Sequence, residues 1–176
     1  MTGTVGHKLT WGRWPVDGVV PLSSTLDSVG GLTRSVEDAA YLFGAVDPAW
    51  GDPEAFLADI ATTEITSLRI TLPSCLIWDD CPSDISAQIY AALHDLGTAG
   101  VHQTDVDGTL LDEAFDHYKR SGIAGAECRD FLEQELPEWL DILHPTVGRR
   151  LETANPLSDP AYASAVEEHH RLTSVA

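Results

Sequence analysis

The chain has 176 residues, of which 10 are basic and 28 acidic, giving a formal net charge of −18. A chain of this length can bury one hydrophobic core, and a hydrophobic content of 43% is typical of a globular protein rather than a disordered one. The negative charge excludes nucleic acid as a partner and argues against anionic membranes, because their phosphates would be repelled.

The charge is unevenly distributed. Residues 1–36 have a balance of +1, so residues 37–176 carry −19. A solvated acidic face and a surface for a basic partner both fit this pattern. No apolar run approaches the roughly 18 residues of a membrane span, and the N-terminus lacks a signal-peptide core. Together with three sparse cysteines, Cys75, Cys81 and Cys128, this predicts a cytoplasmic protein with free thiols.

The first predicted elements are a loop-rich segment and a helix. Residues 1–34 are rich in turn signals, with a short buried extended piece expected over residues 19–22. Gly30-Gly31 indicates close backbone passage or a positive φ. Ser35 and Asp38 form a near capping box that predicts a helix up to Asp47-Pro48. A polar connector follows over residues 47–67, with a possible short helix near residues 55–60.

The next segment predicts a βαβ unit. Residues 68–72 (LRITL) alternate in polarity like a strand. A helix is expected from a cap at Ser83 or Asp84 to Gly97 or Gly100, and a second strand over residues 101–106. Because the strands flank a helix, they should be parallel.

The remaining chain predicts helices only. Amphipathic spacing marks residues 111–118 and 123–132, Pro137 suits the first turn of a third helix, and a last helix begins at residues 158–160. This last helix has no stop signal before Ala176, which suggests a truncated chain.

Three N-terminal stretches carry motifs. Gly6–Arg13 reads GHKLTWGR, Gly18–Gly30 reads GVVPLSSTLDSVG, and Leu32–Ala40 reads LTRSVEDAA. In this order they resemble the patterns G-x-K-x-T-x-G-R, G-x-x-P-L-S-x-S-L-D-x-x-G and L-[TA]-R-[ST]-V-x-D-A-A of the amidase signature family. The departures are Thr25, where that family usually has serine, and Gly31, where proline often stands.

The resemblance is strong over residues 1–47 and looser beyond, where Glu127 and the helix containing Tyr162 fit the family pattern. It implies an α/β class: a fragment of the α/β/α amidase signature fold, a mixed sheet with surrounding helices, incomplete at both ends. The whole of 1–176 would be one partial domain. Its parts are the signature tail and following helix (1–47), the βαβ unit (68–106) and a helical part (110–176).

The resemblance also implies a reaction. The family hydrolyses carboxamides with a serine nucleophile, a second serine and a neutral lysine, which must converge within hydrogen-bond reach. None of the three is expected on this chain, because its motifs lie after the catalytic serines. Ser23, Ser24 and Lys8 are therefore interpreted as structural, and no catalytic residue is assigned.

Two residues remain candidates for a supporting role near the reaction centre. Asp27 precedes Gly30 and can bond backbone amides of the adjacent loop, either as support for the serine loop or as simple turn stabilisation. Arg34 precedes the predicted helix cap, where it can pair with an acid or be structural.

The other patterns are weak. The spacing of Cys75 and Cys81 does not suit zinc, and the adjacent His169 and His170 point in different directions on a helix. Phosphate-loop and nucleophile-elbow motifs are absent from the sequence. We therefore expect neither a metal nor a cofactor.

Three hypotheses follow, of which the third is that the chain is an unproductive remnant of a truncated reading frame. In the first, the chain is a central segment of an amidase that acts on a small-molecule amide, and it is inactive alone. In the second, it is a non-catalytic binding or assembly subunit that pairs with another chain completing the domain. The family also includes the glutaminase subunit of tRNA-dependent amidotransferases, a role that no residue here supports specifically.

Overall fold

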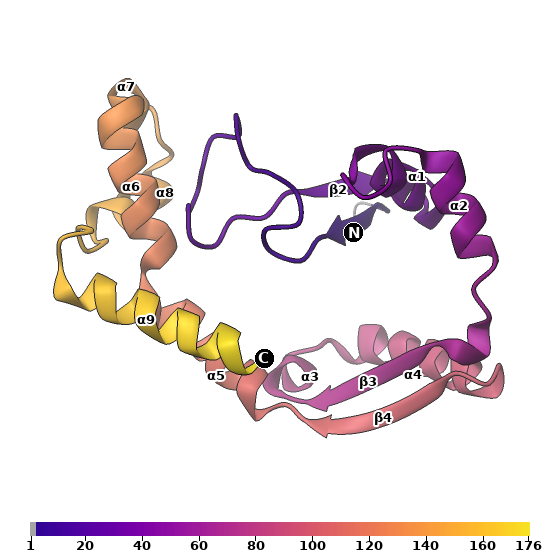
Figure 1. Cartoon of the computed structure of the whole chain (residues 1–176). Helices are drawn as coiled ribbons and strands as arrows, with labels where there is room; N and C mark the ends of the chain where they lie inside the picture. Colours follow the sequence, from indigo (N-terminus) through magenta and orange to yellow (C-terminus); the bar gives the residue numbers. More distant parts are fainter. Residues whose placement is uncertain (1–2) are drawn as a thin grey trace. The chain divides into compact units, whose positions relative to one another are not determined.

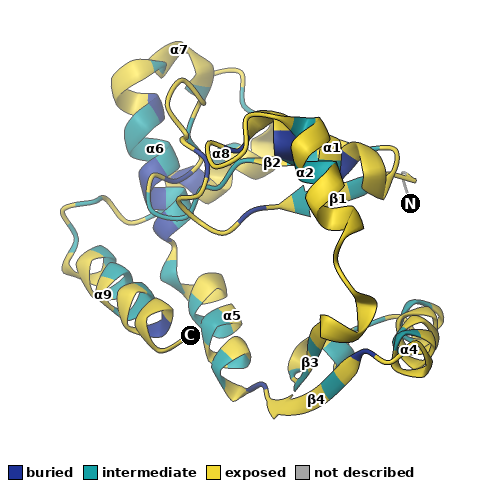
Figure 2. Ribbon diagram, turned by 45° about the vertical axis from the view of Figure 1, so that its right-hand side comes forward, coloured by how far each residue is buried: buried dark blue, intermediate teal, exposed yellow. Residues whose placement is uncertain are grey.

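The computed structural model describes residues 3–176, and two compact units can be recognised in it. Unit 1 comprises residues 3–61 and 121–168, and unit 2 comprises residues 62–120 and 169–176. Figure 1 labels most elements of both units, and Figure 2 also labels β1. Helix α9 (Pro160–Val175) contributes residues to each of them.

Unit 1 begins with a small antiparallel sheet. Strand β1 (Val5–Lys8) pairs with β2 (Gly30–Thr33), so that Lys8 lies opposite Gly30. A side chain at Gly30 would place its Cβ 2.4 Å from the carbonyl oxygen of His7. The glycine is therefore required for the close passage of the two backbones.

Two helices pack beside this sheet. Helix α1 (Val36–Val46) begins as expected, because Ser35 Oγ accepts the backbone N–H of Asp38 at 3.0 Å. Helix α2 (Pro53–Ala61) lies against α1 at Gly44, where an added Cβ would come within 2.8 Å of Pro53 and Phe56. The missing side chain at Gly44 lets the two helices approach.

Three further helices lie wholly within unit 1, and their buried face is formed mainly by one of them. Helix α6 (Ile123–Glu135) buries Ile123, Ala126, Glu127 and Leu132. Figure 2 shows dark blue, buried stretches along this helix. The short α7 (Pro137–Leu140) has proline in its first turn, and α8 (Pro145–Glu152) buries Leu151. At Gly125 the helix α6 comes close to Ala154, just after α8.

Unit 2 is built on a parallel pair of strands, β3 (Arg69–Ser74) and β4 (His102–Asp107), which are drawn side by side in Figure 1. A 3-10 turn (Ile65–Ser67) precedes β3. Helices α3 (Leu76–Asp79) and α4 (Ser83–Thr98) connect the strands, and α5 (Thr109–Ser121) follows them. None of the three helices has a fully buried residue.

The predicted α/β class is confirmed, and the predicted parallel βαβ order is found. The turn after α4 uses Gly100 at a φ of +95°, one of the two glycines proposed for it. The cap at the start of α4 was predicted wrongly. Ser83 and Asp84 lie inside the helix. The first carbonyl to accept a helical N–H is that of Pro82, which accepts those of Ile85 and Ser86, and no side chain caps the helix.

A second prediction also fails. The extended piece expected over residues 19–22 is an exposed turn, with Val19, Val20 and Leu22 each more than half open to water. Gly18 precedes this apolar run and Pro21 interrupts it, and the turn preference of these two residues outweighs the strand propensity of the run. The strands of unit 1 form instead from Val5–Lys8 and Gly30–Thr33. The glycines in both segments lower their strand propensity, so the sequence did not predict them.

Over residues 3–176, every helix is too short or too polar to pass through a lipid bilayer.

Candidate functional site

A buried carboxylate organises the core of unit 1. Glu127 lies on the inner face of α6 and is only 6% exposed. Its Oε2 accepts the hydroxyl of Ser23 at 2.5 Å and the backbone N–H of Thr25 at 3.0 Å. Its Oε1 accepts the hydroxyl of Thr25 at 2.5 Å and that of Tyr162, on α9, at 2.6 Å. We call these four residues the Glu127 cluster.

The four donors keep this carboxylate ionised. Burial alone would raise the pKa of Glu127, but the hydrogen bonds from Ser23, Thr25 and Tyr162 outweigh burial and lower the pKa to about 2. Conversely, burial and the bond to Glu127 raise the pKa of Tyr162, which keeps the phenol protonated as a donor. A carboxylate offers about four lone-pair positions, so this one is saturated.

The loop that reaches Glu127 is fixed from within. Asp27 Oδ2 accepts the backbone N–H groups of Leu22 at 2.8 Å and Ser23 at 3.0 Å. Ser23 Oγ in turn accepts the N–H of Leu26 at 3.1 Å while it donates to Glu127. This segment, residues 22–27, lies within the most specific motif of the sequence, and Glu127 joins it to α6.

A second buried carboxylate anchors the earlier part of the N-terminal loop. Asp47, just after α1, accepts two bonds from the Arg13 guanidinium, at 2.6 and 3.0 Å, and the indole N–H of Trp14 at 3.0 Å. The bond from Arg13 is the main cause that holds the pKa of Asp47 below its ordinary value, and burial opposes it. This bidentate pair fixes the GR end of the first motif to the end of α1.

The two residues predicted to support a reaction centre, Asp27 and Arg34, differ in whether their side chains form hydrogen bonds. Asp27 does bond backbone amides of its own loop, as the sequence suggested. Arg34 is exposed, and its guanidinium has no hydrogen-bond or ion-pair partner among residues 3–176. Lys8 donates to the backbone carbonyl of Leu9, and Ser24 is exposed, whereas its neighbour Ser23 is 1% exposed.

Three residues that organise unit 1 were not among the predicted site residues. The sequence placed Glu127 and Tyr162 only in the looser family pattern, and Asp47 only at the end of a helix. A signal was present for Glu127, because a glutamate at helical spacing among Ile123 and Leu132 occupies an apolar face. A buried carboxylate at such a position requires hydrogen-bond donors from elsewhere in the chain. Which residues would supply them could not be read from the sequence.

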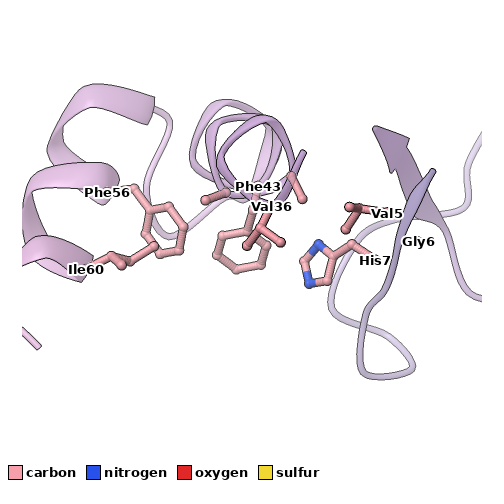
Figure 3. A pocket seen from close by; sticks show the side chains of 9 residues that line it. Val5, Gly6, His7, Val36, Phe43, Phe56 and Ile60 are labelled. Atoms are coloured by element: carbon pink, nitrogen blue, oxygen red, sulfur yellow. The ribbon is translucent and has the colours of Figure 1, made fainter. Parts of the chain in front are cut away.

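Unit 1 also has an apolar hollow of about 340 Å³. Figure 3 shows its walls, where Phe43 of α1 lies between Phe56 of α2 and His7 of β1. The ring centres of Phe43 and Phe56 are 4.9 Å apart, and those of His7 and Phe43 are 5.6 Å apart. The full lining is Val5, Gly6, His7, Val36, Ala39, Ala40, Phe43, Phe56 and Ile60.

Among residues 3–176, no three His, Cys, Asp or Glu side chains come together in a way that could hold a metal ion. The thiols of Cys75, Cys81 and Cys128 are free and half-buried. Burial and the nearby charge of Asp27 raise the pKa of Cys128, which disfavours the reactive thiolate.

Comparison with known proteins identifies the class. The Amidase family profile matches residues 1–167. The chain is 40% identical over 163 residues to 2-amino-5-chloromuconic acid deaminase of Comamonas testosteroni, which covers 92% of this chain and 34% of the deaminase. It is 32% identical over 136 residues to mandelamide hydrolase of Pseudomonas putida, covering 77% of this chain and 25% of the hydrolase.

A solved structure described as an amidase superposes with a TM-score of 0.75 at 25% identity, over 98% of this chain and 37% of its own. The α/β fold and the motif-bearing loop thus have counterparts in amidases. The chain belongs to the amidase family, as its N-terminal motifs indicated. It spans about a quarter to a third of the length of these two relatives.

Proposed function

We propose that this chain is the part of an amidase-type C–N hydrolase that fixes the loop of residues 22–27, and that it acts on a small carboxamide only within a completed domain. The observation that carries the proposal is the Glu127 cluster. It ties the most specific motif segment to α6 and α9 through a saturated, buried carboxylate. Such a cluster suits a scaffold that holds a loop in one conformation.

The same geometry argues that Ser23 is not the nucleophile. A serine hydroxyl attacks an amide only if a base takes its proton and the substrate can reach it. Ser23 is 1% exposed, and its acceptor Glu127 has a pKa of about 2, which makes it a very weak base near neutral pH. Ser24 is exposed, but no hydrogen bond from it to a base is present among residues 3–176.

The substrate class is inferred from relatives. One of them is a mandelamide hydrolase and another is a deaminase of an amino-substituted muconic acid. Both names describe cleavage of a bond between carbon and nitrogen. A small amide is therefore the proposed substrate, with the serine pair and the lysine supplied by polypeptide outside residues 1–176.

A direct assay tests this proposal. The purified chain is incubated with mandelamide and ammonia release is measured, in parallel with labelling by a serine-reactive phosphonate. We expect neither turnover nor labelling. Stoichiometric labelling at Ser23 or Ser24, removed by Ser23→Ala or Ser24→Ala, would place the nucleophile on this chain and overturn the proposal.

The second candidate function, a non-catalytic assembly subunit, is favoured by a different observation. The apolar hollow between β1, α1 and α2 is open to water, and Val36 at its edge is 73% exposed. Exposed apolar surface of this kind is typical of a site that another polypeptide covers. The two candidate functions differ in one property: the complex with the covering polypeptide hydrolyses an amide in the first and does not in the second.

A further inference from the structure

The tripeptide Val-Asp-Gly occurs twice in the chain, each time followed by a β-branched residue. The first copy, residues 16–19 (VDGV), lies in the N-terminal loop of unit 1, and the second, residues 106–109 (VDGT), joins β4 to α5 in unit 2. In an Asp-Gly pair the aspartate side chain can react with the next backbone nitrogen, because glycine has no Cβ to hinder the attack. Since the neighbouring residues are so similar, a difference in reactivity between the two copies has to come from the structure.

The reaction is an isomerisation that needs only water. The glycine nitrogen attacks Cγ of the protonated aspartic acid and loses its proton, and the carboxyl hydroxyl leaves as water, which closes a five-membered succinimide ring. Water then adds to the former backbone carbonyl carbon and breaks its bond to nitrogen. The product is isoaspartate, in which the backbone continues through Cγ. Water addition at Cγ instead restores aspartate, so the overall composition is unchanged on either path.

The reacting groups of the first copy are unrestrained. Asp17 and Gly18 are both exposed, and they form the tip of a turn closed by one backbone bond, from the N–H of Val19 to the carbonyl of Val16 at 3.1 Å. Among residues 3–176, neither the Asp17 carboxylate nor the Gly18 N–H has a hydrogen-bond partner. Ring closure therefore requires only the opening of one exposed turn.

The second copy holds both of its reacting groups. Gly108 is buried, and its N–H donates to the Ser74 carbonyl, at the end of β3, at 3.1 Å. The Asp107 carboxylate accepts the backbone N–H of Thr109 at 3.0 Å and the Thr109 hydroxyl at 2.6 Å. A Cβ added at Gly108 would collide with the Ser74 backbone, so the two segments are closely packed. The nitrogen and the carboxylate must each lose their partners before they can react.

The hydrogen bonds also set the size of the difference. One net hydrogen bond changes an opening equilibrium by about two- to tenfold, and more if a charged group accepts it. Three such bonds restrain Asp107 and Gly108, and one restrains the turn at Asp17. The Thr109 hydroxyl is also the main cause that lowers the pKa of Asp107, which leaves less of the protonated acid that the reaction needs.

We propose that Asp17 is a site of spontaneous isoaspartate formation in the folded chain and that Asp107 is protected from it. The proposal does not depend on the proposed amidase function. The product carries a free α-carboxylate in place of its side chain, and this is the group that isoaspartate methyltransferases methylate. Isoaspartate at this position also adds one backbone carbon directly before Gly18, where the GVVPLSSTLDSVG motif begins.

The experiment compares the two sites in one sample. The full 176-residue chain is incubated at mildly acidic pH, folded in one arm and unfolded in guanidinium chloride in the other. After digestion, an isoaspartate methyltransferase with labelled S-adenosylmethionine measures the product in the peptide of each site. We expect Asp17 to react at least about tenfold faster than Asp107 in the folded chain. The two sites should react at similar rates in the unfolded chain.

Three variants make the test specific. Asp17→Glu would have to close a six-membered ring and should abolish the signal at this position, whereas Asp17→Asn forms the same succinimide with ammonia leaving and should react faster. Thr109→Val makes the second copy identical to the first and removes the hydroxyl bond. It should accelerate the reaction at Asp107 by about two- to tenfold in the folded chain and leave it unchanged in the unfolded one. Circular dichroism checks that each variant is folded.

Two results would overturn the proposal in the folded arm: equal rates at the two sites, or no isoaspartate at Asp17. A difference of the same size in guanidinium chloride would also overturn it, because the sequence and not the structure would then set the rates. All of these results are independent of whether the chain takes part in amide hydrolysis.

Discussion

Tyr162 and Thr25 donate to the same oxygen of Glu127, Oε1, at 2.6 and 2.5 Å. The two hydroxyls come from α9 and from the N-terminal motif loop, so one atom connects segments far apart in the sequence. Because Oε2 also accepts two donors, Glu127 has no position left for substrate or metal. Its contribution is to the arrangement of the loop.

Replacing the Glu127 carboxylate should destabilise unit 1. In Glu127→Gln, the amide nitrogen would face donors that a carboxylate oxygen had accepted, and hydrogen bonds to a charged group contribute about 1.5–3 kcal/mol each. We expect the free energy of unfolding of unit 1 to fall by about 2–3 kcal/mol. Urea unfolding followed by tryptophan fluorescence measures it, because Trp11, Trp14, Trp50 and Trp139 belong to this unit.

The control for that substitution is Glu133→Gln on the same helix. Glu133 pairs with Arg129 at 2.7 Å, but both side chains are more than a third exposed. Its loss should change the free energy of unfolding by less than about 0.5 kcal/mol. Equal effects of the two substitutions would refute the role assigned to the Glu127 cluster.

The Glu127 cluster also predicts how stability depends on pH. The pKa of Glu127 is about 2 in the folded chain against an ordinary 4.5, so the unfolded chain binds the proton more tightly. The stabilisation is therefore complete above about pH 4.5 and is lost as the pH falls toward 2, with a maximum of about 3 kcal/mol.

Unfolding free energies of the unaltered chain and of Glu127→Gln, measured from about pH 6 down to pH 2.5, test this dependence. The difference between them should shrink within this window. A constant difference across it would mean that the glutamate is not ionised in the folded state, or that its pKa is not lowered.

The Arg13–Asp47 ion pair should stabilise the folded chain more than a pair with a partly exposed guanidinium usually does. Asp47 is 1% exposed and accepts bonds from Arg13, Trp14 and the backbone N–H of Ala49. Asp47→Asn leaves the arginine facing an amide donor, so the melting temperature should fall by several degrees. Asp116→Asn, which breaks an exposed pair with Lys119, should leave it nearly unchanged.

Two glycines within helices predict opposite effects of the same substitution. Gly44→Ala places a Cβ 2.8 Å from Pro53 and Phe56, which forces α1 and α2 apart at a cost of about 1–3 kcal/mol. Gly148→Ala on α8 meets nothing within 4 Å, so it should stabilise by about 0.5–1 kcal/mol. Thermal unfolding of both variants measures the difference, and a shared sign would contradict the packing described here.

Local signals in the sequence predicted much of this fold. The cap at Ser35 and the glycine turn after α4, for which Gly97 and Gly100 were both candidates, depend on neighbouring residues. The parallel strand pair follows from the order strand, helix, strand. The small sheet of β1 and β2 could not. Its strands contain glycines at the places where backbones pass closely, and glycine weakens any strand signal.

The candidate site was less predictable for a related reason. The link between Asp27 and its own loop spans four or five positions and was anticipated. Ser23 and Glu127 are 104 positions apart, and Arg13 and Asp47 are 34 apart. No spacing rule connects such pairs, because the intervening chain decides whether they meet.

That 104-residue separation has a consequence for synthesis of the protein. At about 5–20 residues per second, a ribosome needs roughly 5 to 20 seconds after making Ser23 before it makes Glu127. During this interval the nascent motif loop lacks its anchor, while the segment forming unit 2 is translated in between. This order of synthesis predicts that a chaperone binds the nascent chain early, or that refolding has a slow late step.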